Sequence, residues 1–578
     1  MNYLKKIKSG WGTGNKSVED TSVDRATGDR LVATNSINFD AADGVSIPFD
    51  LATALSTKDW REHLEWPVTP TESAEIPMSA TKRYLAMLKA ISDPFQRRLA
   101  IATLPGIFPR ALAIVEAAFA VQRAHEAGRR MIGGPEELDA LRGQWGTNEI
   151  GELTIPKTPY SPGHNNQLAP PRLAWLRHLK IAAPWNGWQF PAALISPTAT
   201  ALSSSALLDR AVHLPGERVL FRYPKTLLDD AMRGATTAPI QDDVRELEER
   251  YVVALSSEPA LSDEMQAIVA ALIRRIVTVT LEPAGQHLKA FECARNLPKR
   301  IWSGSAGIYL QRIIGLEIMR RGGDVVRFAH GGCYGHLFAN PHEAAVGELA
   351  ASTHFVAPSG NMATVMENSG ALDLIAEVNR PKILALDGDA QLAQSLAMKR
   401  RSSPSRPRVL YVMTKMMGFM QYATPCNPAD VVFLDWQYRL VEYLKTLPID
   451  LLCQPHPGGP IPSGMHPVTK SAPTNDTRFE GIMDWPDVFL YDIVGSTTFI
   501  KATATDRKVV LANLLPKLLS DHFMETVRRR CTLVDVEYDE RNLPNFDKAQ
   551  LADALCDLEQ IGDPTEIREL FLEGSPKW

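Results

Sequence analysis

Cysteine is scarce in this sequence, and its spacing fits neither a metal site nor a disulfide framework. Six cysteines occur in 578 residues, and no two of them form a CxxC pair. Zinc sites of the finger and ribbon types need such pairs, so we expect none here. Scattered free thiols are typical of a reducing compartment. The cysteines are Cys293, Cys333, Cys426, Cys453, Cys531 and Cys556.

Long apolar runs and a strong net charge are also lacking. No apolar run approaches the roughly 20 residues that a membrane span needs. The basic segment MNYLKKIKSGWGTGNKS is not followed by an apolar stretch, so we expect no secretory signal. We therefore expect a cytoplasmic protein, and peripheral contact with the inner membrane face stays open. The net charge of −5 excludes a dominant basic surface, so no nucleic-acid partner is expected.

The composition is that of a soluble globular protein, with 45% apolar and 22% charged residues. The chain is too long for one ordinary core, so several units are expected. Ala, Leu and Arg dominate 80–145, and 243–292 has a similar helical pattern. The predicted division is a poorly ordered lead at 1–50, a helix-rich N-terminal domain at 51–300, a Rossmann-like domain at 301–535 and a helical tail at 536–578.

From residue 299 onward, short apolar strands alternate with amphipathic helices. This alternation predicts an α/β fold with parallel strands and helices on both faces of the sheet. Runs that are apolar throughout, such as VLYVM, fit strands buried on both faces. The predicted strands are 301–306, 324–328, 354–359, 383–387, 409–414, 450–454, 488–492 and 508–513. The predicted helices include Ile308–Arg321, a stripe through Trp436, Leu440, Leu444 and Leu447, and 496–504.

The first loop with candidate chemistry is HGGCYG at 330–335, directly after the predicted strand 324–328. Ligands of open α/β sheets bind outside the carboxyl ends of the strands. His330 at such an end could act as a general base toward a sugar hydroxyl. Glu343 and Glu348 follow closely and could orient it or serve as the base instead. The alternative is a tight glycine turn with a structural histidine.

The second loop contains His456-Pro457, after the predicted strand 450–454. Prolines on both sides of His456 restrict the backbone, so the ring is held in place and could donate to a phosphate or ribose oxygen. The alternative is a rigid turn with no ligand.

The third loop is Asp492-Ile493-Val494-Gly495-Ser496-Thr497-Thr498, which follows the run VFLY and leads into the predicted helix 496–504. Glycine followed by three hydroxyl residues offers N–H and O–H donors near the positive end of a helix, which suits a phosphate. The alternative is an ordinary N-cap. Lys415, after the predicted strand 409–414, could neutralise a phosphate, and a solvated lysine is equally compatible with the sequence.

HGGCYG at 330–335 and STTF at 496–499 together resemble the hallmark of a family of surface-carbohydrate transferases. In that family an HGGxYG loop is followed by a Ser-Thr-Thr-Phe helix start. The order of a His-Gly loop, a His-Pro pair and a Ser/Thr helix start is also similar to GT-B transferases of bacterial surface polysaccharides. These include the CMP-sugar (sialyl and Kdo) transferases and the teichoic-acid glycerophosphotransferases. The resemblance covers roughly residues 300 to 535.

The resemblance implies an α/β, GT-B-like fold with two Rossmann-type halves and a helix-rich N-terminal half on the acceptor side. It implies a metal-independent glycosyltransferase that moves a sugar from a nucleotide-sugar donor, with CMP among the candidate nucleotides. The acceptor would be a surface polysaccharide or glycoconjugate, including lipid-linked ones. Because the nucleotide sugar is a substrate, no cofactor and no metal ion are expected.

The resemblance also assigns roles to residues. Nucleotide binding falls to His456, Pro457, Gly495, Ser496, Thr497 and Thr498, and the cleft lining to Gly331, Gly332, Tyr334 and Lys415. His330 would face the acceptor or the transferred sugar. The acidic motif that sialyltransferases carry in their N-terminal half has no convincing copy here, so the base stays open between His330 and a carboxylate, Glu343 or Glu348.

Other functions remain open from the sequence. Transfer of a polyol phosphate, or epimerisation of a nucleotide sugar, would use the same fold. A non-catalytic GT-B-like scaffold in envelope assembly is the alternative outside enzymes, because a fold does not fix the chemistry.

Overall fold

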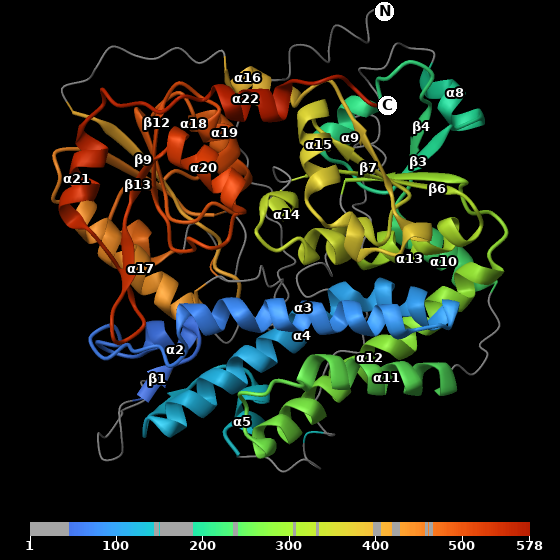
Figure 1. Cartoon of the computed structure of the whole chain (residues 1–578), viewed down its shortest axis with the longest axis horizontal. Coiled ribbons are helices and arrows are strands. Elements are labelled where there is room, and N and C mark those ends of the chain that lie inside the picture. The colour runs from blue at the N-terminus through green and yellow to red at the C-terminus, as the bar shows by residue number, and fades with distance from the viewer. Residues whose placement is uncertain are drawn as a thin grey trace, which may run out of the picture.

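Two parallel β-sheets lie side by side above a layer of long helices in the computed structural model of the chain (Figure 1). The structure describes residues 46–143, 150, 189–234, 241–304, 308–330, 334–396, 406–418, 428–456, 461 and 466–578. The predicted lead at 1–50 lies outside the described residues except for 46–50. Among the predicted site residues, Gly331, Gly332 and Pro457 also lie outside them.

The first sheet has six parallel strands in the order β4-β3-β5-β6-β7-β8. Its central strands are apolar at successive positions because helices cover both faces. The strands are β3 (Ala199–Ala201), β4 (Val219–Phe221), β5 (Arg300–Ser303), β6 (Asp324–Phe328), β7 (His354–Ala357) and β8 (Lys382–Ala385). The helices of this half are α8 (Gln189–Ile195), α9 (Ala206–Ala211), α10 (Pro224–Arg233), α13 (Tyr309–Arg320), α14 (Tyr334–Leu337), α15 (Gly360–Asn368) and α16 (Ala390–Ser395). Shorter turns are the 3-10 helices η5 (Leu372–Leu374) and η6 (Glu377–Asn379).

The second sheet has five parallel strands in the order β10-β9-β11-β12-β13. The strands are β9 (Arg408–Val412), β10 (Asp450–Gln454), β11 (Val488–Tyr491), β12 (Lys508–Ala512) and β13 (Thr532–Val534). The accompanying helices are α17 (Asp430–Leu444), η8 (Pro467–Lys470), α18 (Phe479–Ile482), α19 (Thr497–Thr503) and α20 (Asp521–Arg530). Trp436, Leu440 and Leu444 of the predicted stripe are fully buried in α17, whereas Leu447 lies beyond the end of this helix and is partly buried. The predicted parallel α/β fold is therefore confirmed.

The distribution of strands between the sheets differs from the predicted division. The segment 301–535 contributes to two sheets, with β5 to β8 in the first and β9 to β13 in the second. The first sheet also takes β3 and β4 from within 51–300. These two strands have three residues each, which is too short to show a period of two in the sequence. Strand β3 is defined instead by its pairing with β5, and β4 by its pairing with β3.

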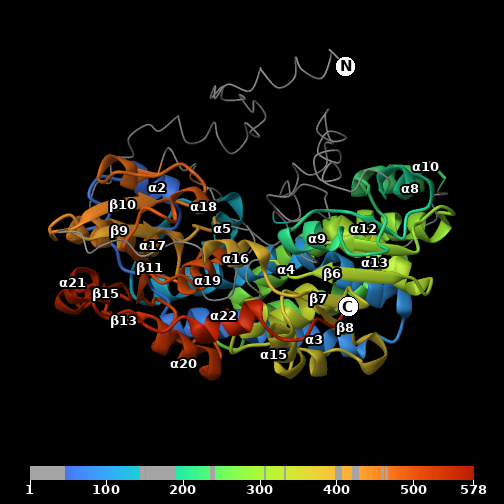
Figure 2. The same ribbon diagram turned by 90° about the horizontal axis from the view of Figure 1, so that it is seen from above.

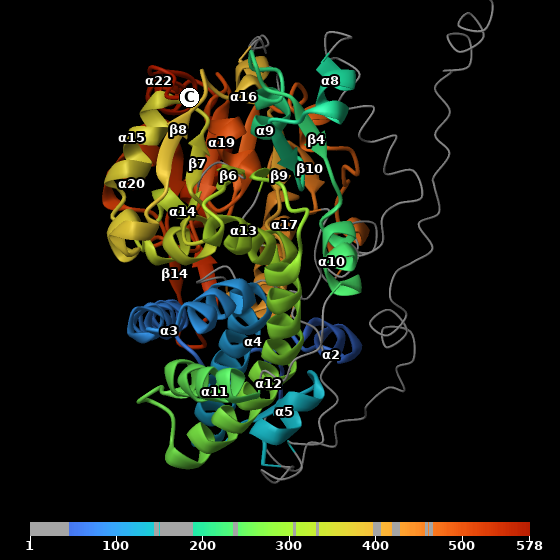
Figure 3. The same ribbon diagram turned by 90° about the vertical axis from the view of Figure 1, so that its right-hand side faces the viewer.

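The helical layer runs beneath both sheets (Figure 3). Its helices are α3 (Pro70–Ala90), α4 (Pro94–Glu126), α5 (Glu136–Leu141), α11 (Gln241–Ser256) and α12 (Asp263–Cys293). A two-stranded parallel sheet of β1 (Ser46–Pro48) and β2 (Arg130–Ile132) and the helix α2 (Leu51–Ser56) complete the layer. Arg61 joins it to the second half through Asp435 at 2.9 Å and Glu442 at 3.0 Å.

Helix α4 is the one described helix that is long and apolar enough to cross a membrane by length and composition alone. Most of its apolar stretch is buried inside the protein, as in the core helix of a soluble fold. Pro105, Arg110 and Glu116 interrupt the stretch in the sequence, so the sequence alone predicts no apolar run of this length. In the structure the helix continues through Pro105 and Pro109.

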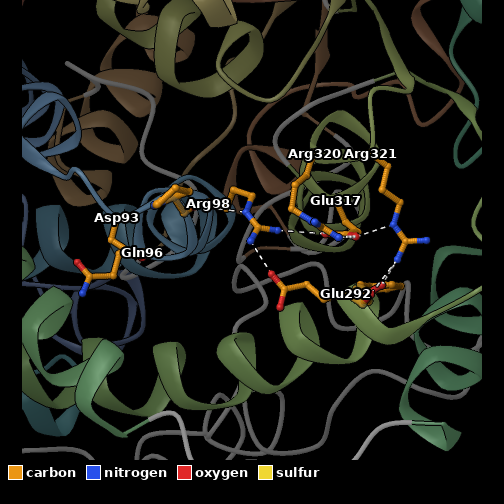
Figure 4. A network of polar contacts seen from close by, with 9 residues as sticks. Asp93, Gln96, Arg98, Glu292, Glu317, Arg320 and Arg321 are labelled. Atoms are coloured by element: carbon orange, nitrogen blue, oxygen red, sulfur yellow. Dashed lines mark hydrogen bonds and ion pairs between the residues drawn. The ribbon is translucent and has the colours of Figure 1, made fainter.

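A buried carboxylate fixes the helical layer to the first sheet (Figure 4). Glu317 of α13 has a fully buried side chain and accepts from Arg98 of α4 at 3.1 Å. It also accepts from Arg320 at 2.8 Å and Arg321 at 2.6 Å. Arg98 reaches Glu292 of α12 as well. Because the buried charge is paired on several sides, this cluster holds three helices in a fixed relation.

A second buried side chain, Arg312 of α13, explains how α4 tolerates a proline. Pro105 has no N–H, so the carbonyl of Ile101 loses its helical partner. The Arg312 Nε donates to this carbonyl at 2.9 Å. The other two guanidinium nitrogens donate to the carbonyls of Gly347 and Val346, at 2.7 and 2.8 Å. Both lie in a π-helix, η4 (Ala344–Leu349), so Arg312 ties that helix to α4.

The C-terminal segment returns from the second half to the first. After the hairpin of β14 (Val536–Tyr538) and β15 (Pro544–Phe546) come α21 (Lys548–Cys556) and α22 (Thr565–Leu572), so the tail predicted as helical also contains a hairpin. Helix α22 lies across the junction of the halves (Figure 2). Arg568 donates to the Ala504 carbonyl of the second half at 2.7 Å. Beyond α22, Lys577 pairs with β8, and the Trp578 ring packs on Trp302.

Candidate functional site

The strand order of the second sheet locates a candidate ligand-binding crevice. In the second sheet β10 lies on one side of β9, whereas β11, β12 and β13 follow on the other side. Such a reversal is a topological switch point, and ligands of open α/β sheets bind outside the carboxyl ends of the strands there. The switch point lies between β9 and β11. The loops that contain Lys415 and Ser496 leave from these two strands.

Asp492 ties the loops at this switch point together. Its buried carboxylate accepts from the Tyr411 hydroxyl and, at 2.8 Å, from the Thr414 hydroxyl, both on the β9 side. Its backbone carbonyl accepts from Leu514 N, after β12, at 3.0 Å. Burial raises the pKa of Asp492 to about 6. Sequence reasoning gave this residue no role, although an aspartate directly after the apolar run VFLY was the available signal.

Ser496 has the geometry of an N-cap. Its hydroxyl oxygen accepts from Thr498 N at 3.3 Å and lies 2.6 Å from the Thr498 hydroxyl. Gly495 and Thr497 are exposed beside it. The ordinary capping role considered for this motif is therefore present. Gly495 and Thr497 are exposed to solvent at the carboxyl edge of the sheet.

His456 and Lys415 leave the same edge of the sheet. His456 is exposed and lies two residues beyond the end of β10, while Lys415 is half-buried after β9. The strand β9 separates β10 from β11, so the ends of β10 and β11 are about 10 Å apart at two strand spacings. The structure thus places His456, Lys415 and Ser496 on loops from one carboxyl edge. The neighbouring Pro457 lies outside the described residues.

His330 follows β6 in the first sheet and faces a carboxylate. Its Nδ1 lies 3.7 Å from Glu348 Oε1, and the two side chains are 51% and 22% exposed. At this distance the contact is an ion pair when His330 is protonated, and it is longer than a hydrogen bond. Tyr334, the first residue of α14, lies nearby in the chain, and its side chain lies outside the described residues, as do Gly331 and Gly332.

Glu343 lies at the start of the π-helix that carries Glu348. π-Helical turns are rare and are frequently found at functional sites. The Oε2 of Glu343 is buried and has no hydrogen-bond partner in the part of the chain that the structure describes. Burial, together with the neighbouring charge of Glu348, raises the pKa of Glu343 to about 7. The structure therefore brings His330, Glu343 and Glu348 into one region of the first sheet.

We expect the substitution Glu343→Gln to make the protein more stable at pH 8. The pKa of Glu343 in the folded protein is about 7, above the ordinary 4.5, so the folded state favours the neutral carboxyl group. The contribution of Glu343 to the free energy of unfolding is fully present below pH 4.5 and is lost as the pH rises through 7. Glutamine cannot ionise and avoids the loss, which amounts to about 3 kcal/mol at most. Urea denaturation at pH 5 and pH 8 measures the difference.

The matched control for this prediction is Glu116→Gln. Glu116 lies on α4, and burial alone raises its pKa to about 7 as well. Glu116→Gln should give a similar gain in stability at pH 8. It should leave the shift in melting temperature caused by a ligand unchanged, because Glu116 lies in the helical layer. A Glu343→Gln protein that is no more stable than the wild type at pH 8 would contradict a raised pKa of Glu343.

The loops of the two sheets meet directly. Ala339 N, just after α14, donates to the Leu518 carbonyl at 3.0 Å, and Ser520 N donates to the Leu337 carbonyl at 2.9 Å. Leu337 and Ala339 follow β6 of the first sheet, and Leu518 and Ser520 follow β12 of the second sheet. Helix α14 accordingly lies between the two halves (Figure 1). The carboxyl edges that carry His330 and Ser496 are therefore joined by loops from both sheets.

Comparisons with known proteins add no family name. No family model matches the chain, no curated protein matches it, and no solved structure matches it. Among the described residues, no group of three or more His, Cys, Asp and Glu side chains is arranged to hold a metal ion.

Proposed function

We propose that the protein is a glycosyltransferase that moves a sugar from a nucleotide-sugar donor to a carbohydrate or lipid-linked acceptor. The observation that supports this best is the junction of the two carboxyl edges through the bonds between 337–339 and 518–520. Each edge is the ligand-binding side of its sheet. An arrangement in which one sheet binds the donor and the other the acceptor is the GT-B arrangement, which is part of the proposal.

In the proposed reaction the second sheet holds the nucleotide. The exposed backbone of Gly495 and the hydroxyl of Thr497 would donate to a phosphate oxygen at the start of α19, and Lys415 would supply positive charge. His456 would donate to a phosphate or ribose oxygen. Asp492 fixes the loops that carry these groups. Stabilising the leaving phosphate by donors already in place lowers the barrier to its departure.

The first sheet supplies the base in this proposal. His330 would take the proton from the acceptor hydroxyl, with Glu348 behind its Nδ1 to orient the ring and to stabilise the imidazolium that forms. The 3.7 Å separation is of the kind that shortens when a substrate is bound. The acceptor oxygen then forms a bond to the sugar carbon as the nucleotide phosphate leaves. The reaction is placed in the cytoplasm, at the inner membrane face for a lipid-linked acceptor.

We expect one nucleotide among CMP, CDP, UDP and GDP to raise the melting temperature clearly. A ligand present at 100 times its dissociation constant stabilises the fold by about 2.7 kcal/mol. His456→Ala should reduce the shift, whereas His63→Ala, at another exposed histidine, should leave it unchanged. No shift with any nucleotide would sink the transferase proposal and favour the non-catalytic scaffold. A clear shift that His456→Ala leaves intact would remove His456 from the site.

A further inference from the structure

His336 of α14 is a buried histidine whose ring nitrogens have no hydrogen-bond partner among the described residues. The residue is 5% exposed, and neither ring nitrogen has a hydrogen-bond partner within the described segments. A neutral imidazole carries one donor and one acceptor, and burial without partners is costly for both. Native proteins leave few polar groups in this state, and each requires an explanation. The centroids of the Phe355 ring and the His336 imidazole are 5.5 Å apart, so Phe355 supplies an apolar wall.

A second buried side-chain atom without a hydrogen-bond partner in the described part of the chain lies on a neighbouring segment. The Glu343 Oε2 is in this condition, and Glu343 directly precedes the π-helix. Helix α14 packs against the start of that π-helix, because a Cβ placed on Gly335 would lie 3.5 Å from the Cα and Cβ of Ala344. His336 and Glu343 are the chain neighbours of Gly335 and Ala344, the two residues in this contact. They also adjoin the loops that join the two sheets.

We propose that His336 and Glu343 form a subsite for a hydroxyl group of the transferred sugar. The proposal deepens the proposed glycosyltransferase function and rests on it. A hydroxyl both donates and accepts, so it can satisfy an imidazole nitrogen and a carboxyl oxygen together. Sugars present such hydroxyls on an otherwise apolar ring, which suits the Phe355 wall.

The charges of the subsite favour a neutral group over a phosphate. Burial lowers the pKa of His336 to about 4, so its ring is uncharged at neutral pH and offers no positive charge to an anion. Glu343 and the nearby Glu348 are carboxyl groups, which repel anions when ionised. A phosphate would therefore be disfavoured between them. The subsite is distinct from Ser496 and Lys415 on the second sheet, which are assigned to the nucleotide.

The substitution His336→Phe separates a functional role from a structural one. Phenylalanine keeps a ring of similar shape and removes both polar atoms, so the free protein should melt at the same or a higher temperature. The contrasting control is His466→Phe. His466 is also buried, but its Nδ1 accepts from Val468 N at 3.3 Å, so its replacement should lower the melting temperature. His336→Gln keeps a donor and an acceptor and serves as the conservative variant.

The decisive measurement compares each free nucleotide with a conjugate that contains it, which is a nucleotide sugar for CMP, UDP and GDP and a nucleotide-activated polyol for CDP. The pairs are CMP with CMP-N-acetylneuraminate, UDP with UDP-glucose and UDP-N-acetylglucosamine, GDP with GDP-mannose, and CDP with CDP-glycerol. For the wild type, one sugar conjugate should raise the melting temperature beyond its free nucleotide. His336→Phe should keep the nucleotide shift, lose this increment and bind the conjugate about 10- to 100-fold more weakly. His336→Gln should retain part of the increment.

The outcomes distinguish this subsite from the proposed function. If no nucleotide stabilises the wild type, the transferase proposal and the subsite fail together. A nucleotide could stabilise the wild type while no sugar conjugate raises the melting temperature further, or while CDP-glycerol is the one conjugate that does so. In either case nucleotide binding stands and the sugar subsite is overturned. If His336→Phe keeps the full increment, His336 is a structural residue. The same conclusion follows if the ligand-free His336→Phe protein melts well below the wild type and His336→Gln does not restore the increment.

Discussion

Replacing His330 by glutamine should lower the rate of donor cleavage by about 100- to 10,000-fold, the usual contribution of a general base. Glutamine keeps hydrogen-bonding capacity but cannot accept the proton of the attacking hydroxyl. Because half of the His330 side chain is exposed, the fold should tolerate the change with little loss of stability. The assay is release of free nucleotide from the nucleotide sugar that stabilises the protein, with water or a glycolipid extract as acceptor.

Two further variants show whether His330 is the base or Glu343 is. Glu348→Gln should reduce the rate less than His330→Gln, because Glu348 acts through the orientation and charge of the ring. Glu343→Gln should mainly weaken binding of the sugar conjugate. If Glu343→Gln removes activity and His330→Gln leaves it within a few-fold of the wild type, the base is the carboxylate and the assignment of His330 is wrong.

Replacing Ser496 by aspartate should abolish most of the nucleotide-induced stabilisation while leaving the free protein folded. Aspartate caps a helix as well as serine does, so α19 keeps its N-cap. Its negative charge would lie within several ångströms of a bound phosphate, at a cost of about 1–4 kcal/mol, or roughly 5- to 1,000-fold in affinity. Nucleotide titration followed by calorimetry measures the loss.

Matched variants separate the capping role of Ser496 from phosphate binding. Ser496→Asn is a neutral cap and should bind nucleotide within a few-fold of the wild type. Ser496→Ala removes the cap and should cost about 1 kcal/mol of stability. Ser262→Asp adds the same charge at the N-cap of α12 in the helical layer and should leave binding unchanged. Equal nucleotide affinity in the Ser496→Asp and Ser496→Asn proteins would exclude a phosphate at this helix start.

Local sequence patterns predicted the strands that lead to the candidate site. The run 324–328 is β6 with the predicted bounds, and 450–454 is β10. Ser496 begins a helix as its residue type indicates, and its role as an N-cap was the alternative considered for it. These features depend on residues a few positions apart, so they can be read from the chain directly. The paired residues His330 and Glu348 could be named as candidates, but not placed.

Long-range contacts account for what local patterns did not predict. Helix α4 continues through Pro105 because Arg312, more than 200 residues later, binds the carbonyl that the proline frees. The same side chain binds carbonyls of the π-helix, which no pattern in the sequence indicated. His336 drew no attention in the sequence, where it follows a glycine and precedes an apolar run. Its burial without a partner became visible only in the folded chain.

By itself, the sequence determined that the chain forms a parallel α/β protein, and which strand ends carry His330, His456 and Ser496. Hydrogen bonding and apolar periodicity act over a few residues, so the sequence contains that information locally. Tertiary structure decided which strands share a sheet, that the loops after β6 and β12 meet, and that the pKa of Glu343 rises to about 7. Those properties depend on burial and on neighbours far away in the chain, because segments distant in sequence exclude water from the same space.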